Sequence, residues 1–138
     1  MFLDASAVVA LLGREPGWQE IEKRLGESGG PFYISPLVRF EASLALARQK
    51  SAHGRSSPDL VRQAQRVVDA FAEDFAAEEV PISAEVGRLA LEASATWGRA
   101  VGHAADLNFG DCFAYACAKS LKVPLLYKGD DFARTDLA

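Results

Sequence analysis

Four acidic residues occupy positions where a carboxylate is costly unless it is paired or binds a cation. Asp4 directly follows the first apolar stretch of the chain, and Asp131 follows the last one at a glycine turn. Glu41 and Asp111 lie in helical patterns that are otherwise largely apolar. A carboxylate that faces a protein core loses its hydration, so it needs a base or a metal ion as a partner.

Glu41 is the most informative of the four. A capping hydroxyl and a proline at Ser35-Pro36 predict a helix that runs to about Ser51. The expected inward stripe of this helix consists of Leu37, Phe40, Leu44 and Ala45. On a helical wheel Glu41 lies inside that stripe, which favours a functional carboxylate. An ion pair with Arg48, or with a distant base, is the alternative.

Asp111 opens an almost wholly apolar helical run, from Phe109 to Leu121. An acid in a first helical turn complements the helix dipole and can pair with a capping residue, here Asn108. The sequence alone therefore leaves Asp111 with two interpretations, a helix-start residue or a member of a site.

The other two acids also have structural alternatives. Asp4 is a natural N-cap for the first helix. Ser6 follows it by two residues, where its hydroxyl can cap the helix or steady the carboxylate. Asp130 and Asp131 stand at a glycine turn, where aspartates are common for reasons of turn geometry.

Short apolar stretches and helical periodicity alternate along the chain in the order β-α-α-β-α-α-β-α-α-β. The predicted strands lie at residues 2–3, 32–34, 79–82 and 123–127. The predicted helices lie at about 5–13, 16–25, 35–51, 60–75, 86–97 and 109–121. Strands joined by helical crossovers predict the α/β class, with a small, mostly parallel sheet of four to five strands covered by helices. We expect a single domain over residues 1–138.

This fold class brings the four acids together. Ligands of open parallel sheets bind at the carboxyl ends of the strands, where we expect Asp4, Glu41, Asp111 and Asp131 to meet. Carboxylates so close together cannot all ionise unless a cation neutralises them. Oxygen ligands alone suit the hard cations Mg²⁺ and Mn²⁺, which serve phosphodiester hydrolysis. The pattern predicts a metal-dependent hydrolase.

Composition excludes other classes. The chain has 19 acidic and 15 basic residues and a net charge of -4, which argues against nucleic-acid binding by bulk positive charge. Without the four acids named above, the acidic and basic residues would balance. There is no apolar run of membrane-spanning length, and an acid near the N-terminus argues against a signal peptide. Cys112 and Cys117, five residues apart in a predicted helix, are expected to be buried free thiols, which fits a cytoplasmic protein.

Four segments resemble those of one family. They are Leu3-Asp4-Ala5-Ser6-Ala7, Glu41 in the helix after the second strand, Asn108-Phe109-Gly110-Asp111-Cys112-Phe113, and Leu126-Tyr127-Lys128-Gly129-Asp130-Asp131-Phe132. Their order and the chain length resemble the PIN domains of VapC-type toxins from bacterial toxin–antitoxin systems. The resemblance extends over essentially the whole chain and implies a PIN-like three-layer α/β/α fold.

The resemblance also implies a function and partners. The implied activity is that of a Mg²⁺-dependent (or Mn²⁺-dependent) endoribonuclease. The implied partner is a VapB-type antitoxin that covers the first helices and the helix after the long loop. Homodimers, and operator DNA bound through the antitoxin, are implied as well. Asp4, Glu41 and Asp111 carry over as catalytic, metal-binding acids, and Asp131 as the fourth, with Asp130 as its alternative. Ser6 carries over as a supporting residue.

The surroundings of the site suggest further contacts. Arg99, His103 and Lys128 lie in or beside segments that should approach the acids, and of these Lys128 and His103 are the expected RNA contacts. For a homodimer, Leu44, Phe71 or Trp97 are the expected sources of the interface.

Other classes remain as alternatives. A phosphohydrolase of the haloacid-dehalogenase type also places an aspartate after its first strand, but it needs a second one two residues later, where this chain has Ser6. A non-catalytic binding module would not need all four acids. A housekeeping RNA-processing PIN nuclease shares every feature described so far.

Overall fold

Four short strands form a parallel sheet in the order β3-β2-β1-β4 in this computed structural model, which describes residues 1–137. The strands are β1 (Phe2–Leu3), β2 (Tyr33–Ile34), β3 (Glu78–Glu79) and β4 (Leu125–Leu126). All three pairings are parallel, and Phe2 of β1 lies opposite both Tyr33 and Leu125. The predicted single domain over 1–138 also includes residue 138, which lies outside the described residues.

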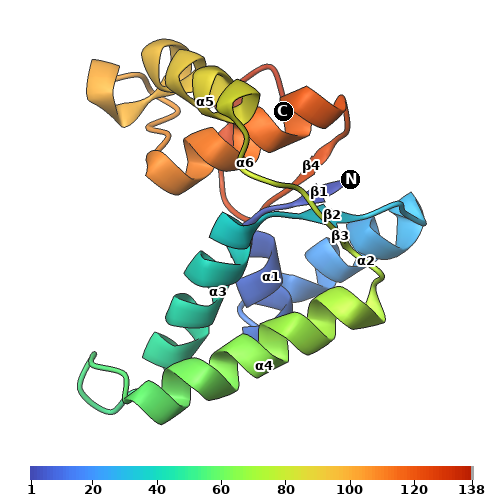
Figure 1. Ribbon diagram of the computed structural model, residues 1–138, viewed down its shortest axis with the longest axis vertical. Helices are drawn as coiled ribbons and strands as arrows, with labels where there is room; N and C mark the ends of the chain where they lie inside the picture. Colours follow the sequence, from blue (N-terminus) through green and yellow to red (C-terminus); the bar gives the residue numbers. More distant parts are fainter. Residues whose placement is uncertain (138) are drawn as a thin grey trace.

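Helices cover both faces of the sheet, as the α/β prediction requires. They are α1 (Ala5–Gly13), α2 (Trp18–Ser28), α3 (Pro36–Gln49), α4 (Pro58–Asp74), α5 (Ala84–Trp97) and α6 (Phe109–Leu121), with short 3-10 turns η1 (Arg99–Val101) and η2 (Phe132–Arg134). In Figure 1, α5 and α6 lie on one side of the sheet and α1 to α4 on the other. The three-layer α/β/α architecture is thus confirmed.

Most helices begin at a side chain that caps them. Asp4, Ser35, Ser57, Ser83 and Asn108 each accept a hydrogen bond from a backbone N–H in the first turn of the following helix. Such caps satisfy N–H groups that have no partner within the helix. Two of the five, Asp4 and Asn108, belong to segments that carry the predicted site.

The inward face of α3 differs from the prediction. Val38, Ala42 and Leu46 are buried, whereas Phe40 is 63% exposed. The helix is apolar on two adjacent faces, and its packing against α1 and α4 selects the one that begins at Val38. Glu41 is half-buried at the border of that face rather than at its centre.

Two element boundaries also differ. β3 occupies 78–79 rather than 79–82, because Pro81 has no N–H to continue the ladder of this edge strand. Val80 makes the last contact, donating its backbone N–H to the Ile34 carbonyl at 2.7 Å. α2 begins at Trp18 rather than at Pro16, because Gly17 between them takes a left-handed conformation with φ of 88°.

The core lies on both faces of the sheet. Phe2, Leu3, Ile34 and Leu126 are almost fully buried, as expected for a parallel sheet between helical layers. Cys112 and Cys117 are buried free thiols, which confirms the prediction for this pair. Within residues 1–137, no helix has both the length and the apolar character that crossing a bilayer requires.

Candidate active site

The carboxyl ends of β1 and β4 meet at one edge of the sheet, and hydrogen bonds lock the segments that follow them. The Asp4 backbone N–H donates to the Leu126 carbonyl at 2.9 Å. Two residues beyond β4, the Lys128 backbone N–H donates to Ser6 Oγ at 3.0 Å. Ser6 therefore joins the start of α1 to the turn that carries Asp131, as its predicted supporting role requires.

Asp4 is the buried centre of the site, with 6% of its surface exposed. Its Oδ2 accepts hydrogen bonds from the Ser6 backbone N–H at 2.9 Å and from the Ser6 hydroxyl. Burial raises the pKa of Asp4, and the charge of Asp131 raises it further, while the bonds from Ser6 oppose the rise. Asp4 is thus both the N-cap of α1 and a site carboxylate, because Oδ1 remains available.

Glu41 reaches the same place from α3. Burial raises its pKa to about 7, and the charges of Asp4 and Asp111 add to the rise. No base lies within 4.0 Å of this carboxylate among residues 1–137, so the ion pair with Arg48 is not formed. The carboxyl lies against Gly110 of α6, where a Cβ would stand 2.6 Å from Glu41 Cδ.

Asp111 takes its predicted place at the start of α6 and also keeps an oxygen available for the predicted site. Its Oδ2 accepts from the Asn108 backbone N–H at 2.8 Å, and its own N–H donates to Asn108 Oδ1 at 3.0 Å, which completes a capping box. Burial raises the pKa of Asp111 to about 6, helped by the charges of Asp4 and Asp131. The cap fixes one carboxyl oxygen and leaves Oδ1 for another ligand.

Asp131 lies at the open rim of the site, directly before η2. Its side chain is exposed, and its charge raises the pKa of both Asp4 and Asp111. Asp130, also exposed, is not among the charges that act on these two acids. The charges that act on Asp4 and Asp111 therefore favour Asp131 over Asp130, and Asp131 as the fourth acid stays a prediction.

The two basic residues predicted to contact RNA have partners within the protein. Lys128 Nζ donates to Glu15 Oε2 at 2.6 Å, in a half-buried ion pair. His103 Nδ1 accepts from the Ala105 N–H at 3.0 Å, and its ring packs edge-on against Trp97 at 5.1 Å between centroids. The RNA contacts of Lys128 and His103 stay predictions.

A divalent cation fits the chemistry of this donor set. Asp4, Glu41 and Asp111 offer only hard oxygen ligands, and no basic side chain forms an ion pair with any of them within residues 1–137. As placed in the described part of the chain, no three Asp, Glu, His or Cys side chains converge closely enough to ligate one ion.

The whole chain is similar in sequence to known proteins. A sequence profile described as the PIN domain matches residues 1–137. A VapC ribonuclease of Rhizobium meliloti (strain 1021) is 48% identical over 139 residues, covering 99% of this chain and 98% of the relative. The chain belongs to the VapC ribonuclease family of PIN domains. Ribonuclease VapC42 of Mycobacterium tuberculosis (strain H37Rv) is 33% identical, covering 99% and 96% of the two chains.

A solved VapC structure confirms the PIN fold. It is that of Mycobacterium tuberculosis VapC20, a toxin described as cleaving the sarcin-ricin loop. It superposes with a TM-score of 0.70 over 99% of this chain and 95% of VapC20, at 20% sequence identity. At that identity the likeness concerns the fold alone.

Burial of the Glu41 carboxylate should lower the free energy of unfolding of this VapC protein, and the Glu41→Gln substitution tests this. The pKa of Glu41 is higher in the folded protein, about 7 against 4.5, so stability is lost as the pH rises between these values. The full shift would correspond to about 3 kcal/mol, but solvent screening of this partly exposed group reduces it. We expect Glu41→Gln to raise the free energy of unfolding by about 1 kcal/mol at pH 8 without divalent ions.

Urea titration measures this effect, and Glu73→Gln is the matched control. Glu73 is an exposed glutamate of α4. A Glu41→Gln variant that is less stable than wild type, or no more stable than Glu73→Gln, contradicts the electrostatic description of the site.

Gly110, which had no predicted role, also lies at this site of the VapC fold, and so does Arg99, whose segment was expected to approach the acids. Gly110 gives the Glu41 carboxyl its space, and a glycine in a helical turn, which costs about 1 kcal/mol relative to alanine, was the available signal. Among residues 1–137, Arg99 is the opposite charge that lowers the pKa of Asp111. No sequence pattern connected Arg99 with Asp111.

Proposed function

We propose that this protein is a Mg²⁺-dependent endoribonuclease and the toxin of a VapBC-type pair, neutralised by a VapB-type antitoxin. One observation carries the proposal. Asp4, Glu41 and Asp111 lie near one another at the carboxyl edge of the sheet, where the charge of Asp4 raises the pKa of both Glu41 and Asp111, and none of the three has an ion-pair partner among residues 1–137. Membership of the VapC ribonuclease family supports the choice of RNA as substrate.

The residues have distinct tasks in this proposal. When bound, Mg²⁺ would neutralise phosphate charge and activate water for attack on phosphorus. Asp4, oriented by Ser6, would be the fixed ligand, and Asp111, oriented by Asn108, the second one. Glu41, with its pKa of about 7, is only partly ionised near neutral pH without a cation and would be fully ionised as a ligand. Asp131 at the exposed rim completes the acidic set.

Cleavage of cellular RNA tests the proposed enzymatic activity. Purified protein is incubated with total RNA in MgCl₂, in MnCl₂ or in excess EDTA. The proposal predicts discrete fragments with Mg²⁺ or Mn²⁺ and intact RNA with EDTA. Intact RNA under all three conditions, for a folded protein, would overturn the nuclease assignment.

Growth tests the toxin role separately. Induction of the protein should arrest growth, and co-expression of the short reading frame beside its gene should relieve the arrest. Harmless expression of a protein that cleaves RNA in vitro would instead favour a housekeeping PIN nuclease.

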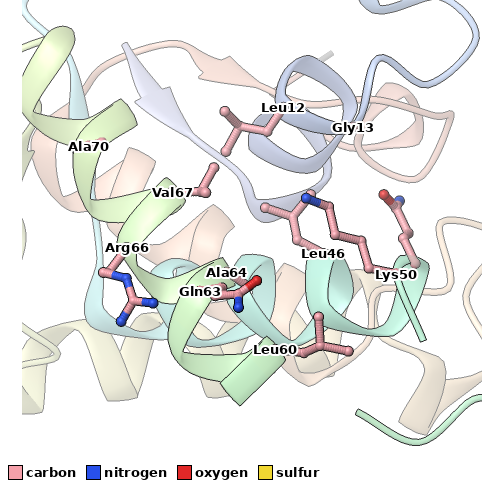
Figure 2. A pocket seen from close by; sticks show the side chains of 11 residues that line it. Leu12, Gly13, Leu46, Lys50, Leu60, Gln63, Ala64, Arg66, Val67 and Ala70 are labelled. Carbon is pink, nitrogen blue, oxygen red and sulfur yellow. The ribbon is translucent and has the colours of Figure 1, made fainter. Parts of the chain in front are cut away.

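An apolar groove between α1, α3 and α4 is the proposed docking site of the antitoxin. Its volume is about 630 Å³, and Figure 2 shows Leu12, Leu46, Leu60 and Val67 around it. Arg66 and Lys50 flank the hollow, so the fitting partner is an apolar segment with acidic residues beside it. α1 and α4 are the first helix and the helix after the long loop, where we predicted the antitoxin.

Val67→Glu should disrupt this docking without affecting catalysis. Val67 is 43% exposed in the free protein, and a carboxylate there would be buried without a partner under the antitoxin. We expect affinity for the product of the adjacent reading frame to fall by roughly 10- to 100-fold, while cleavage of RNA is retained because the groove holds none of the four acids. Isothermal titration calorimetry measures the affinity.

Gln65→Glu is the matched control for that experiment. It adds the same charge to α4, on an exposed position outside the groove. Equal affinities for the Val67→Glu and Gln65→Glu variants would place the antitoxin elsewhere.

We further propose a homodimer, which in the complex binds operator DNA through the antitoxin. Phe71, one of the three expected interface residues, is buried in the core and therefore unavailable. Leu44 and Trp97 are half-buried. The apolar side chains that are well exposed lie elsewhere, on Phe40 of α3, Leu91 of α5 and Phe109 of α6.

A further inference from the structure

Arg99 is a well-exposed cation held in a fixed orientation next to the acidic site. It begins η1, and 65% of its side chain is exposed. Its Nε donates to Asp106 Oδ1 and Oδ2 at 3.1 and 3.0 Å, and its Nη2 donates to Oδ2 at 2.8 Å. This paired geometry orients the guanidinium plane, as arginine–carboxylate pairs do.

Backbone contacts tie Arg99 to the segment that carries Asp111. The Arg99 N–H donates to the Leu107 carbonyl at 2.9 Å, and the Leu107 N–H donates to the Trp97 carbonyl at 3.2 Å. Leu107 directly precedes Asn108, the cap of α6. Gly98 lets the chain turn tightly out of α5 just before Arg99, because a Cβ there would stand 2.8 Å from Ser94 Cα. Arg99 and Asp111 therefore keep a fixed relative position.

A second tether joins the same loop to the segment after Asp131. Arg134 of η2 donates from Nη1 to the Ala104 carbonyl at 2.8 Å. The pKa of Arg99 is raised chiefly by its bond to Asp106 and further by the charges of Asp111 and Asp131. Arg99 thus lies where both site acids act on it.

We propose that Arg99 binds a phosphate of the RNA strand beside the scissile one, and that Asp106 is the positioning residue that orients it. This inference rests on the proposed nuclease function. Asp106 engages the N–H of Nε and one N–H of Nη2, which leaves three of the five guanidinium N–H groups for a ligand. Arginine suits phosphate because its fork of donors matches the oxygens.

Lys128 is less suited to this task. Its side chain is only about one-third exposed, and its ammonium group already donates to Glu15. Arg99 has no such competitor for its outer N–H groups among the hydrogen bonds of the described residues.

Substitution at Asp106 separates RNA binding from a purely structural ion pair. If Arg99 serves only to hold the loop through Asp106, loss of either partner has the same effect. If Arg99 binds phosphate, Asp106→Asn leaves its charge and its donors in place. Asparagine also tolerates the left-handed backbone at this position, where φ is 51°.

The experiment compares RNA affinity among variants that cannot cut. All carry Asp4→Asn, and the probe is a fluorescein-labelled single-stranded RNA pool of random sequence in MgCl₂. Fluorescence anisotropy gives Kd over a range of NaCl concentrations. Arg62→Gln is the matched control, since Arg62 is also 65% exposed and bonded to an aspartate, Asp59 at 3.2 Å.

We expect Arg99→Gln to raise Kd about ten-fold and to reduce the slope of log Kd against log[NaCl] by about one. Arg99→Lys should preserve the slope. Asp106→Asn, which loosens the orientation of Arg99 but keeps its charge, should preserve the slope and raise Kd by clearly less than Arg99→Gln does, and Arg62→Gln should bind like the reference. Equal Kd values for Arg99→Gln and Arg62→Gln, or equal losses for Asp106→Asn and Arg99→Gln, would overturn the inference. If the Asp4→Asn reference protein binds no RNA and the wild-type protein cuts none, the nuclease proposal itself is overturned.

Discussion

Replacing Asp4 by asparagine is expected to lower the rate of Mg²⁺-dependent RNA cleavage by at least about 10³-fold while leaving the protein folded. Asp4 is the most buried of the four acids, and its carboxylate has Oδ1 free of the bonds from Ser6. Asparagine removes the charge that a hard cation requires. It also keeps the N-cap, because asparagine accepts the Ser6 N–H as well as aspartate does.

The controls for this substitution separate catalysis from folding. Asp130→Asn makes the same change of charge on an exposed residue that does not act on the pKa of Asp4. We expect that variant to cleave like wild type. Thermal unfolding of Asp4→Asn should occur at or above the wild-type temperature, because the pKa of Asp4 is raised by burial of its charge. Near-wild-type cleavage by folded Asp4→Asn protein would refute the site.

Divalent-cation binding is expected to depend steeply on pH. Cations bind the ionised carboxylates, so protons compete with them below a pKa of about 7 for Glu41 and about 6 for Asp111. Affinity is therefore complete above both values and is lost as the pH falls through them. If both residues are ligands, we expect affinity for Mg²⁺ or Mn²⁺ to fall by roughly 100- to 1000-fold from pH 8 to pH 5.

Titration calorimetry at several pH values measures this dependence, and repeating it in buffers of different ionisation enthalpy counts the protons released. Glu41→Gln is the informative variant, because it should remove the upper part of the pH dependence and leave the part due to Asp111. A cation affinity that stays constant between pH 8 and pH 5 would show that neither carboxyl is a ligand.

The parts of the site that local sequence controls could be predicted. A short apolar stretch followed by Asp4 indicated a strand and then a capped helix, and both are present. The capping box of Asn108 and Asp111 was likewise evident from residue types three apart. Once parallel strands were inferred, the shared carboxyl edge followed, because crossovers place those ends on the same side.

The parts that depend on packing between distant segments could not be predicted. α3 is apolar on two neighbouring faces, and only its contacts with α1 and α4 turn Val38 inward and leave Phe40 exposed. The ion pair of Lys128 with Glu15 joins residues 113 positions apart, and no local sequence pattern predicts it. The approach of Arg99 to Asp111 likewise depends on how the loop after α5 folds back.

The negative net charge argues against nucleic-acid binding by bulk positive charge, but it does not argue against cleavage of RNA at a metal site. The net charge of -4 equals the number of acids at the carboxyl edge. A cation bound there would supply the attraction for phosphate that the rest of the chain lacks. The excess negative charge is thus a local feature of the proposed active site.

The central claim is that these acids form a cation-dependent site that cuts RNA. Sequencing of cellular RNA ends after induction of the wild-type protein and of Asp4→Asn tests it most directly. The account predicts new 5′ ends at discrete positions with the wild-type protein and their absence with Asp4→Asn. The same new ends with both proteins, at equal expression, would contradict it.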